Sequence, residues 1–119
     1  MPKSWNLGTV TFQYFWAPSN TNTGNVIMGL QGVGVANDDT ADVVFGTAQE
    51  VTDAGGGAVE DVLVSSVSSA MTIAGTPADD DLTFFQLYRD AADGSDTFTG
   101  DARVMGIKLF YTTAAANAA

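Results

Sequence analysis

The pattern of hydrophobic and polar residues between Leu82 and Thr113 is the strongest folding signal in the chain. Residues 82–89 and 103–111 are two runs of strand length, rich in aromatic and aliphatic side chains, and the segment between them is rich in Asp, Gly, Ser and Thr. Two such runs on either side of turn-forming residues are typical of paired antiparallel strands. The pattern therefore predicts a long β-hairpin, around which the rest of the chain is expected to fold.

Both faces of this predicted hairpin are apolar. Side chains alternate between the faces of a strand, so the predicted core face of the second run consists of Met105, Ile107, Leu109 and Tyr111. Its opposite face consists of Val104, Gly106, Lys108 and Phe110. In the first run the alternating sets are Phe85 with Leu87 and Phe84 with Tyr88. A strand that is apolar on both faces is usually covered on both, and a chain of this size has room for one core. The second cover is therefore expected to come from another subunit.

The rest of the chain predicts further short strands separated by turn signals. The aromatic run from Trp5 to Trp16 has a single face made of Val10, Phe12, Tyr14 and Trp16. Other candidate strands lie within residues 25–36, 42–45, 48–52, 59–67 and 71–74. Seven or eight short strands without helical periodicity predict an all-β, antiparallel, jelly-roll-like β-sandwich with no substantial helix. We expect one domain over residues 1–111 and an Ala-rich tail over residues 112–119, either frayed or held against a neighbouring molecule.

Composition excludes several classes of chemistry. The chain of 119 residues has no histidine and no cysteine, so it cannot form a Ser-His-Asp or Cys-His arrangement and lacks the commonest transition-metal ligands. A glycosidase that uses a pair of carboxylates stays formally open. Most of the aspartates lie in predicted turns, however, where they typically bond the local backbone. We therefore expect no enzymatic activity and no cofactor.

The charge of the chain also limits its partners. Lys and Arg number 4 against 14 Asp and Glu, which gives a formal net charge of -10. Such a surface repels phosphate backbones, so direct binding to nucleic acid is not expected. No window is long and apolar enough to span a bilayer, and the first residues, MPKSWNLGTV, lack the apolar segment of a signal peptide. We expect no membrane partner.

The acidic segment between the two runs is a candidate metal site or a fixed turn. Its carboxylates are Asp90, Asp93, Asp96 and Asp101, and clustered carboxylates are ligands for Ca²⁺. Their spacing does not match an EF-hand. Arginines flank the segment, and an arginine can form forked hydrogen bonds to a carboxylate. We therefore favour ion pairs over a metal, and the residues expected to stabilise the hairpin are Arg89, Asp90, Asp96, Asp101 and Arg103.

The run YRDAADGSDTFTGDARVMGIKLFYTT, residues 88–113, resembles the C-terminal segment of small virion structural proteins of tailed bacteriophages. In those proteins an R-D, a D-T and a G-D-A-R/Q-hydrophobic element precede a final apolar strand. A looser similarity extends to VTFQYFW, GNVIMGL and the turn AGTPA. The resemblance covers most of the chain, and only the C-terminal motif is distinctive. It carries over to Arg89, Asp90, Asp96, Thr97, Gly100, Asp101, Ala102 and Arg103, for which it implies a role in fixing the hairpin.

The resemblance implies a homotrimer of jelly-roll type, either a capsid cement or decoration protein or a part of a tail fibre. The chain shows no long helical or coiled stem, which favours a compact trimer that is made in the host cytoplasm and bound to the major capsid protein on the outer capsid surface. In such a trimer we expect Phe84, Tyr88 and Phe110 at the subunit interface. The alternative is a host-receptor module that binds a glycan through exposed aromatic rings or through the Asn/Thr loop of residues 19–25.

Overall fold

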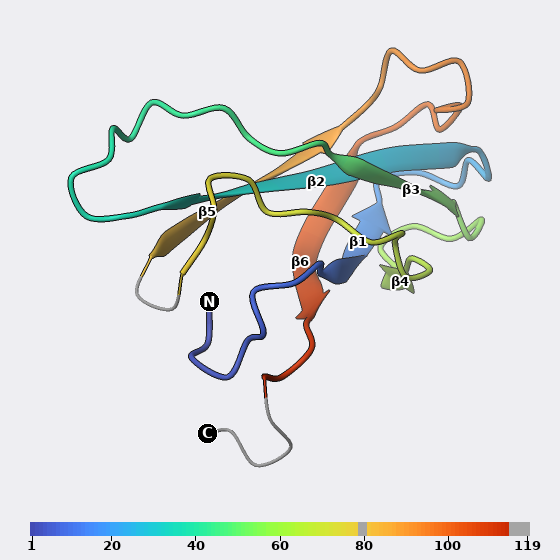
Figure 1. The fold of residues 1–119 in the computed structure, drawn as a ribbon. Coiled ribbons are helices and arrows are strands. Elements are labelled where there is room, and N and C mark those ends of the chain that lie inside the picture. Colours follow the sequence, from blue (N-terminus) through green and yellow to red (C-terminus); the bar gives the residue numbers. More distant parts are fainter. Residues whose placement is uncertain (79–80, 115–119) are drawn as a thin grey trace.

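Six strands form two three-stranded sheets in the computed structural model, which describes residues 1–78 and 81–114 (Figure 1). In chain order the strands are β1 (Thr11–Pro18), β2 (Asn25–Val35), β3 (Gln49–Ala54), β4 (Leu63–Val64), β5 (Leu82–Arg89) and β6 (Ala102–Phe110). One sheet has the order β4-β1-β6 and the other β3-β2-β5, and the strand pairs within both sheets are antiparallel. The expected all-β antiparallel sandwich is confirmed, with six strands in place of seven or eight.

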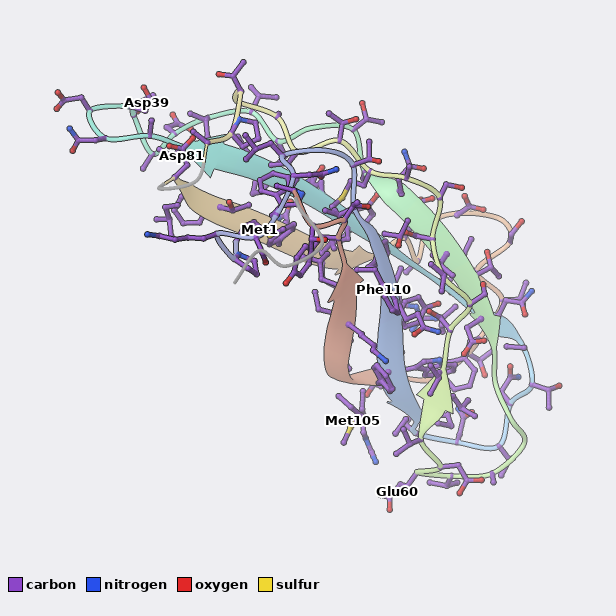
Figure 2. All side chains as sticks on the ribbon, turned by 60° about the horizontal axis from the view of Figure 1, so that its bottom comes forward. Met1, Asp39, Glu60, Asp81, Met105 and Phe110 are labelled. Atoms are coloured by element: carbon purple, nitrogen blue, oxygen red, sulfur yellow. The ribbon has the colours of Figure 1, made fainter. Side chains whose placement is uncertain are left out.

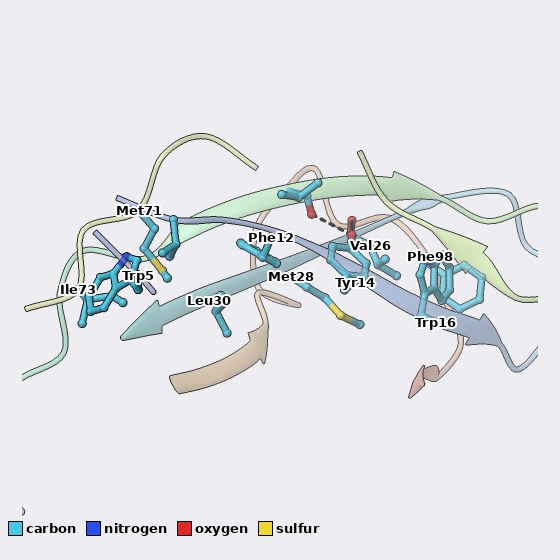
Figure 3. Close-up of a cluster of buried hydrophobic side chains, with 12 residues drawn as sticks. Trp5, Phe12, Tyr14, Trp16, Val26, Met28, Leu30, Met71, Ile73 and Phe98 are labelled. Carbon is cyan, nitrogen blue, oxygen red and sulfur yellow. Dashed lines mark hydrogen bonds between the residues drawn. The ribbon is translucent and has the colours of Figure 1, made fainter. Parts of the chain in front are cut away.

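The strands at the centre of the two sheets supply most of the core (Figure 3). Their inward side chains, all at most 2% exposed, are Phe12, Tyr14 and Trp16 of β1 and Val26, Met28 and Leu30 of β2. The aromatic face expected for the first strand is thus buried as a unit. Trp5, Met71 and Ile73 close one end of this core, and Phe98 packs beside Trp16 at the other (Figure 3).

Two of the expected short strands are present only as isolated contacts. Met71 forms a single bridge with Val10, and Ala74 forms one with Val33. Residues 42–45 lie outside the six strands, but the next residue, Gly46, donates its N–H to the carbonyl of Gly32 at 3.0 Å. These segments satisfy backbone groups in the second half of β2, because β3 pairs with β2 only as far as Leu30.

The long hairpin predicted for residues 82–113 is not formed. β5 pairs with β2, and β6 pairs with β1, so the two arms are edge strands of different sheets (Figure 1). Glycines of β2 help to explain this choice, because their lack of a side chain makes room for the large rings of β5. A Cβ atom at Gly29 would lie 2.5 Å from the Tyr88 ring, and one at Gly32 would lie 3.0 Å from the Phe85 ring. The nested pairing of β1 with β6 and of β2 with β5 is of the kind produced by winding a long hairpin into a jelly roll.

A β-bulge in β6 changes the alternation of its side chains. The register shifts where Phe15 and Trp16 lie opposite Gly106 and Val104, which leaves Met105 without a partner on β1. An extra residue in one strand moves the side chains beyond it to the other face. Val104 therefore lies on the inward face, opposite Trp16.

The predicted core face of residues 103–111 is wrong in part, and the bulge accounts for Met105 alone. Of its four residues only Leu109 packs against the core. The other three are exposed: Met105 by 63%, Ile107 by 39% and Tyr111 by 37%. Val104 faces inward, but its side chain is also 47% exposed. β6 thus turns apolar side chains toward a side of the sandwich that nothing in the described part of the chain covers.

The start of the predicted tail is held by the chain's own N-terminal segment. Asn6 donates its N–H to the carbonyl of Thr112 at 2.9 Å, and Ala114 donates its N–H to the carbonyl of Ser4 at 2.7 Å. Residues 112–114 are therefore neither frayed nor dependent on a neighbouring molecule. The remainder of the predicted tail, residues 115–119, lies outside the described residues.

We predict that Tyr14→Phe lowers the free energy of unfolding by about 1–2 kcal/mol, because it removes a buried hydrogen bond. The fully buried Tyr14 hydroxyl donates to the carbonyl of Val51 at 2.9 Å and so ties β1 to β3 of the other sheet. Tyr111→Phe is the matched control, since Tyr111 is exposed, and its effect should stay within about 0.5 kcal/mol. Urea denaturation measures both, and equal effects would contradict the role given to the Tyr14 hydroxyl.

Candidate functional site

Arg89, the last residue of β5, binds the loop that connects β5 to β6, here called the crossover loop (residues 90–101). Its Nε donates to Oδ2 of Asp96 at 3.1 Å, and its Nη2 donates to Oδ1 of the same carboxylate at 2.6 Å. The guanidinium also donates to the carbonyls of Phe98 and Gly100, at 2.8 and 2.9 Å. The forked pair with Asp96 has the geometry expected from the sequence. It fixes the loop to the end of β5.

The carboxylate of Asp96 is the inner half of this pair. Its side chain is 1% exposed, against 24% for Arg89, and its Oδ2 also accepts the backbone N–H of Ile27 at 3.0 Å. The hydrogen bonds from Arg89 hold the pKa of Asp96 below its usual value; burial opposes this effect and the Ile27 N–H adds to it. The loop is thus attached to β2 as well as to β5.

Phe98 of the crossover loop links the Arg89–Asp96 pair to the other sheet. The Arg89 guanidinium lies 5.9 Å from the centre of the Phe98 ring, which packs edge-on against Trp16 with ring centres 5.4 Å apart. Trp16 belongs to β1, and its indole Nε1 donates to Oδ2 of Asp53 on β3 at 2.8 Å. The loop therefore joins both sheets through one continuous set of contacts.

The other residues expected to stabilise the hairpin have different positions. Arg103 pairs with Glu60, outside the crossover loop, at 2.9 Å, and both side chains are more than half exposed. Asp101 contributes backbone groups, since its N–H donates to Oγ of Ser19 at 2.7 Å and its carbonyl accepts the Ser19 N–H. The expectation that these residues bond the acidic loop as a set is therefore corrected. With β5 and β6 in separate sheets, Arg103 approaches the β3–β4 connection instead.

Asp90 belongs to a cluster of three carboxylates. Oxygen atoms of Glu50, Asp90 and Asp93 all lie within 4.8 Å of one another. Burial and the neighbouring Asp90 and Asp93 raise the pKa of Glu50, although Oε2 of Glu50 accepts a hydrogen bond from the Tyr88 hydroxyl at 2.9 Å, which acts in the opposite direction. Three oxygens at this spacing could act as ligands for a hard cation. Two of the aspartates named as calcium candidates from the sequence, Asp96 and Asp101, are not members.

The three residues expected at a subunit interface all lie on outward faces. Phe84 is opposite Val33 of β2 and is 39% exposed. The Tyr88 ring lies over Gly29, and its hydroxyl donates a hydrogen bond to Glu50 of the same chain. Phe110 is opposite Thr11 of β1, with the Lys108 ammonium 5.4 Å from its ring centre. Phe84 and Tyr88 therefore belong to one sheet and Phe110 to the other.

Both edge strands expose apolar side chains, as do Leu7, Val44 and the segment of residues 59–67, and we call β5 and β6 together the β5–β6 flank. Its most exposed members are Leu82, Phe84, Val104, Met105 and Ile107, at 61%, 39%, 47%, 63% and 39%. Figure 2 shows Met105 projecting away from the ribbon at one end of the molecule. Monomeric proteins rarely expose large contiguous apolar surfaces, which often mark interaction sites. The sequence predicted an exposed apolar face on these two runs and named Phe84, but it did not predict the exposure of Met105, for which the neighbouring Gly106 is the kind of signal that accompanies a bulge.

Most of the residues that would bind a glycan in the alternative function are buried or hydrogen-bonded within the chain. Trp5, Phe12, Tyr14 and Trp16 are at most 2% exposed, so they offer no stacking surface. In the loop of residues 19–25 the side-chain oxygens of Asn20 and Asn22 accept backbone N–H groups two residues further on. A shallow depression of about 140 Å³ remains, lined by Thr9, Thr11, Phe110, Tyr111 and Thr112.

Comparison of this chain with protein-family models, with curated proteins and with solved structures finds no match. The part of the chain that the structure describes contains no helix long and apolar enough to cross a membrane. A function is therefore argued from the residues and the fold themselves.

We predict that Asp96→Asn destabilises the protein by roughly 2–4 kcal/mol at pH 7, because it leaves the Arg89 guanidinium without its buried partner. The lowered pKa of Asp96 means that its carboxylate stabilises the fold above the pKa of the unfolded chain, near 4, and that this contribution is lost as the pH falls further. The difference between the variant and the original protein should therefore shrink below about pH 4.

Asp93→Asn is the matched control for this measurement, since it lies in the same loop and its carboxylate faces other acids rather than Arg89. Its effect on the free energy of unfolding should stay within about 0.5 kcal/mol. Urea denaturation at several pH values compares the two variants. A loss from Asp96→Asn that does not depend on pH would show that the ion pair is not its cause.

Proposed function

We propose that this protein is a non-enzymatic structural protein of a tailed-bacteriophage virion, a trimeric cement or decoration protein that stabilises the head by bridging neighbouring capsid subunits. The observation that carries the proposal is the β5–β6 flank, where apolar side chains of both edge strands are exposed in the single chain. A protein that works as an assembled part requires such a surface, because apolar area removed from water drives association.

The motif shared with phage structural proteins supports the same function. Its Arg89, Asp96 and Gly100 take part in the contacts that fix the crossover loop, so the distinctive residues have a structural use. This is the role that the resemblance implies. The loop is held at both sheets and gives the flank a rigid frame, which suits a protein that must resist force on a capsid.

The acidic surface is compatible with a position on the outside of a particle that is filled with DNA. A net charge of -10 disfavours contact with nucleic acid and keeps the protein available for the outer face of the capsid. Contacts repeated across three subunits would add to a strong overall attachment even if each is weak.

A host-receptor module is the second candidate. The shallow depression beside Phe110 and Tyr111 favours it, because aromatic rings and threonine hydroxyls together suit a sugar ring. The aromatic residues of the first strand do not contribute, since they form the core.

We predict that phage heads made without this protein release their DNA at a lower temperature than complete heads, and that adding the purified protein restores the higher temperature. Phe110→Asp should weaken this rescue, because a charge would be buried at the subunit interface. Val44→Asp is the matched control, since Val44 is 88% exposed in a loop, and it should rescue fully. Circular dichroism checks that both variants fold.

Absence of the protein from purified heads, or its presence only in tails, would refute the cement function. Binding to a glycan array, without binding to heads, would establish the host-receptor alternative in its place.

A further inference from the structure

The free edges of β5 and β6 differ in charge from the rest of the chain. None of the 14 Asp and Glu residues lies in the eight residues of β5 or the nine of β6, whereas three of the 4 Lys and Arg residues do, namely Arg89, Arg103 and Lys108. Copies of a chain with a net charge of -10 repel one another. The β5–β6 flank is therefore the surface on which two copies approach with the least repulsion.

Each of these strands also has an edge available for pairing. β5 and β6 stand at the ends of their sheets, and within residues 1–78 and 81–114 neither has a strand on its outer side. Unpaired N–H and C=O groups along an edge are a template for another strand. The inward side chains that remain partly exposed, including Val104 and Ile107, would be covered by a strand added there.

Charges at the ends of the two edges are complementary. Asp81 immediately precedes β5 (Figure 2), and Asp90 follows Arg89, whose guanidinium is paired with the buried Asp96, so a carboxylate outside that ion pair stands at each end of this edge. Arg103 and Lys108 lie toward the two ends of β6. If β6 of one copy runs antiparallel to β5 of the next with Lys108 opposite Asp81, Arg103 lies opposite Gln86 and keeps its partner Glu60, so the direct charge contact is the one between Lys108 and Asp81.

Pairing of like edges is unfavourable by the same reasoning. An antiparallel pair of two β5 edges would place Asp81 beside Asp90 of the other copy at each end. Two β6 edges would place Lys108 beside Arg103. Like charges set directly opposite each other are destabilising. The charges therefore favour a contact between two different edges.

Features that protect β6 from indiscriminate pairing also select this partner. A lysine and a bulge on an edge strand discourage the addition of other strands, and β6 has both, at Lys108 and Met105. No salt bridge involves Lys108 within the described part of the chain. A partner that places a carboxylate beside Lys108 avoids the cost of leaving its charge unpaired at the contact, so the lysine acts as a specificity determinant.

We infer that copies of this chain join head to tail, with the free edge of β5 of one copy paired antiparallel with the free edge of β6 of the next. A contact between two different surfaces closes into a ring when the rotation allows it. The number of copies in the ring, three, rests on the proposed function, while the pairing of the edges rests on the strands and charges alone.

Charge reversal tests this pairing in solution. Sedimentation velocity of the purified protein should show an oligomer that dissociates on dilution. Lys108→Glu and Asp81→Lys should each raise the dissociation constant by roughly tenfold or more, and the double variant should restore it because the attraction is re-formed with its sign exchanged. Asp61→Lys, an exposed change in the β3–β4 connection, is the matched control and should leave association unchanged or stronger.

Cysteine cross-linking gives a second measurement that does not depend on the charges. The chain has no cysteine, so a double variant, Gln86→Cys with Met105→Cys, carries one thiol in the middle of each edge. A short bis-maleimide should link it into closed rings, whereas either single variant should stay unlinked.

The outcomes separate this inference from the cement function. Dimers from Gln86→Cys alone, a failure of the double charge variant to recover, or a protein that stays monomeric at every concentration would each overturn the edge pairing. Normal ring formation by a protein that does not bind heads would leave the pairing standing and remove the cement function.

Discussion

The guanidinium of Arg89 holds the point at which the chain leaves one sheet and crosses to the other. Its bonds to Asp96, Phe98 and Gly100 set the path of the crossover loop, and the Asp96 carboxylate extends them to the backbone of Ile27. Because the loop crosses between the sheets, β5 and β6 become edges of different sheets instead of partners. The two unpaired edges follow from the placing of β5 and β6 in different sheets.

The sequence predicted the class of fold because its signals were local. Alternation from Val10 to Trp16 identified a buried aromatic face, and the turn formers separated the strands correctly into an antiparallel sandwich. A fork between a flanking arginine and an aspartate of the loop was also expected, but the sequence left both Arg89 and Arg103, and Asp90, Asp96 and Asp101, open as its members.

Pairing between strands and side chains that are far apart in the chain could not be predicted from the sequence in the same way. Residues 82–89 and 103–111 look like the two arms of a hairpin, yet β5 fits the Gly-bearing surface of β2, where Gly29 and Gly32 admit its rings. The bulge at Met105 likewise depends on the register with β1 and moves Val104 to the inward face. Arg103 was assigned to the acidic loop only because it is close in sequence, whereas its partner Glu60 comes from another connection. Each difference arises from a contact between residues that are far apart in the chain.

The core is centred on β1 and β2, and we propose that another copy covers the open flank at β5 and β6. Hydrogen exchange tests this claim most directly, because amides without a hydrogen bond on an exposed edge exchange rapidly with solvent unless a partner protects them. We expect amides of β5 and β6 that do not bond β2 or β1 to exchange slowly at high protein concentration and faster on dilution. Amides in the middle of β1 and β2 should be unaffected. Exchange from β5 and β6 that is the same at all concentrations would show that no other copy pairs with these edges.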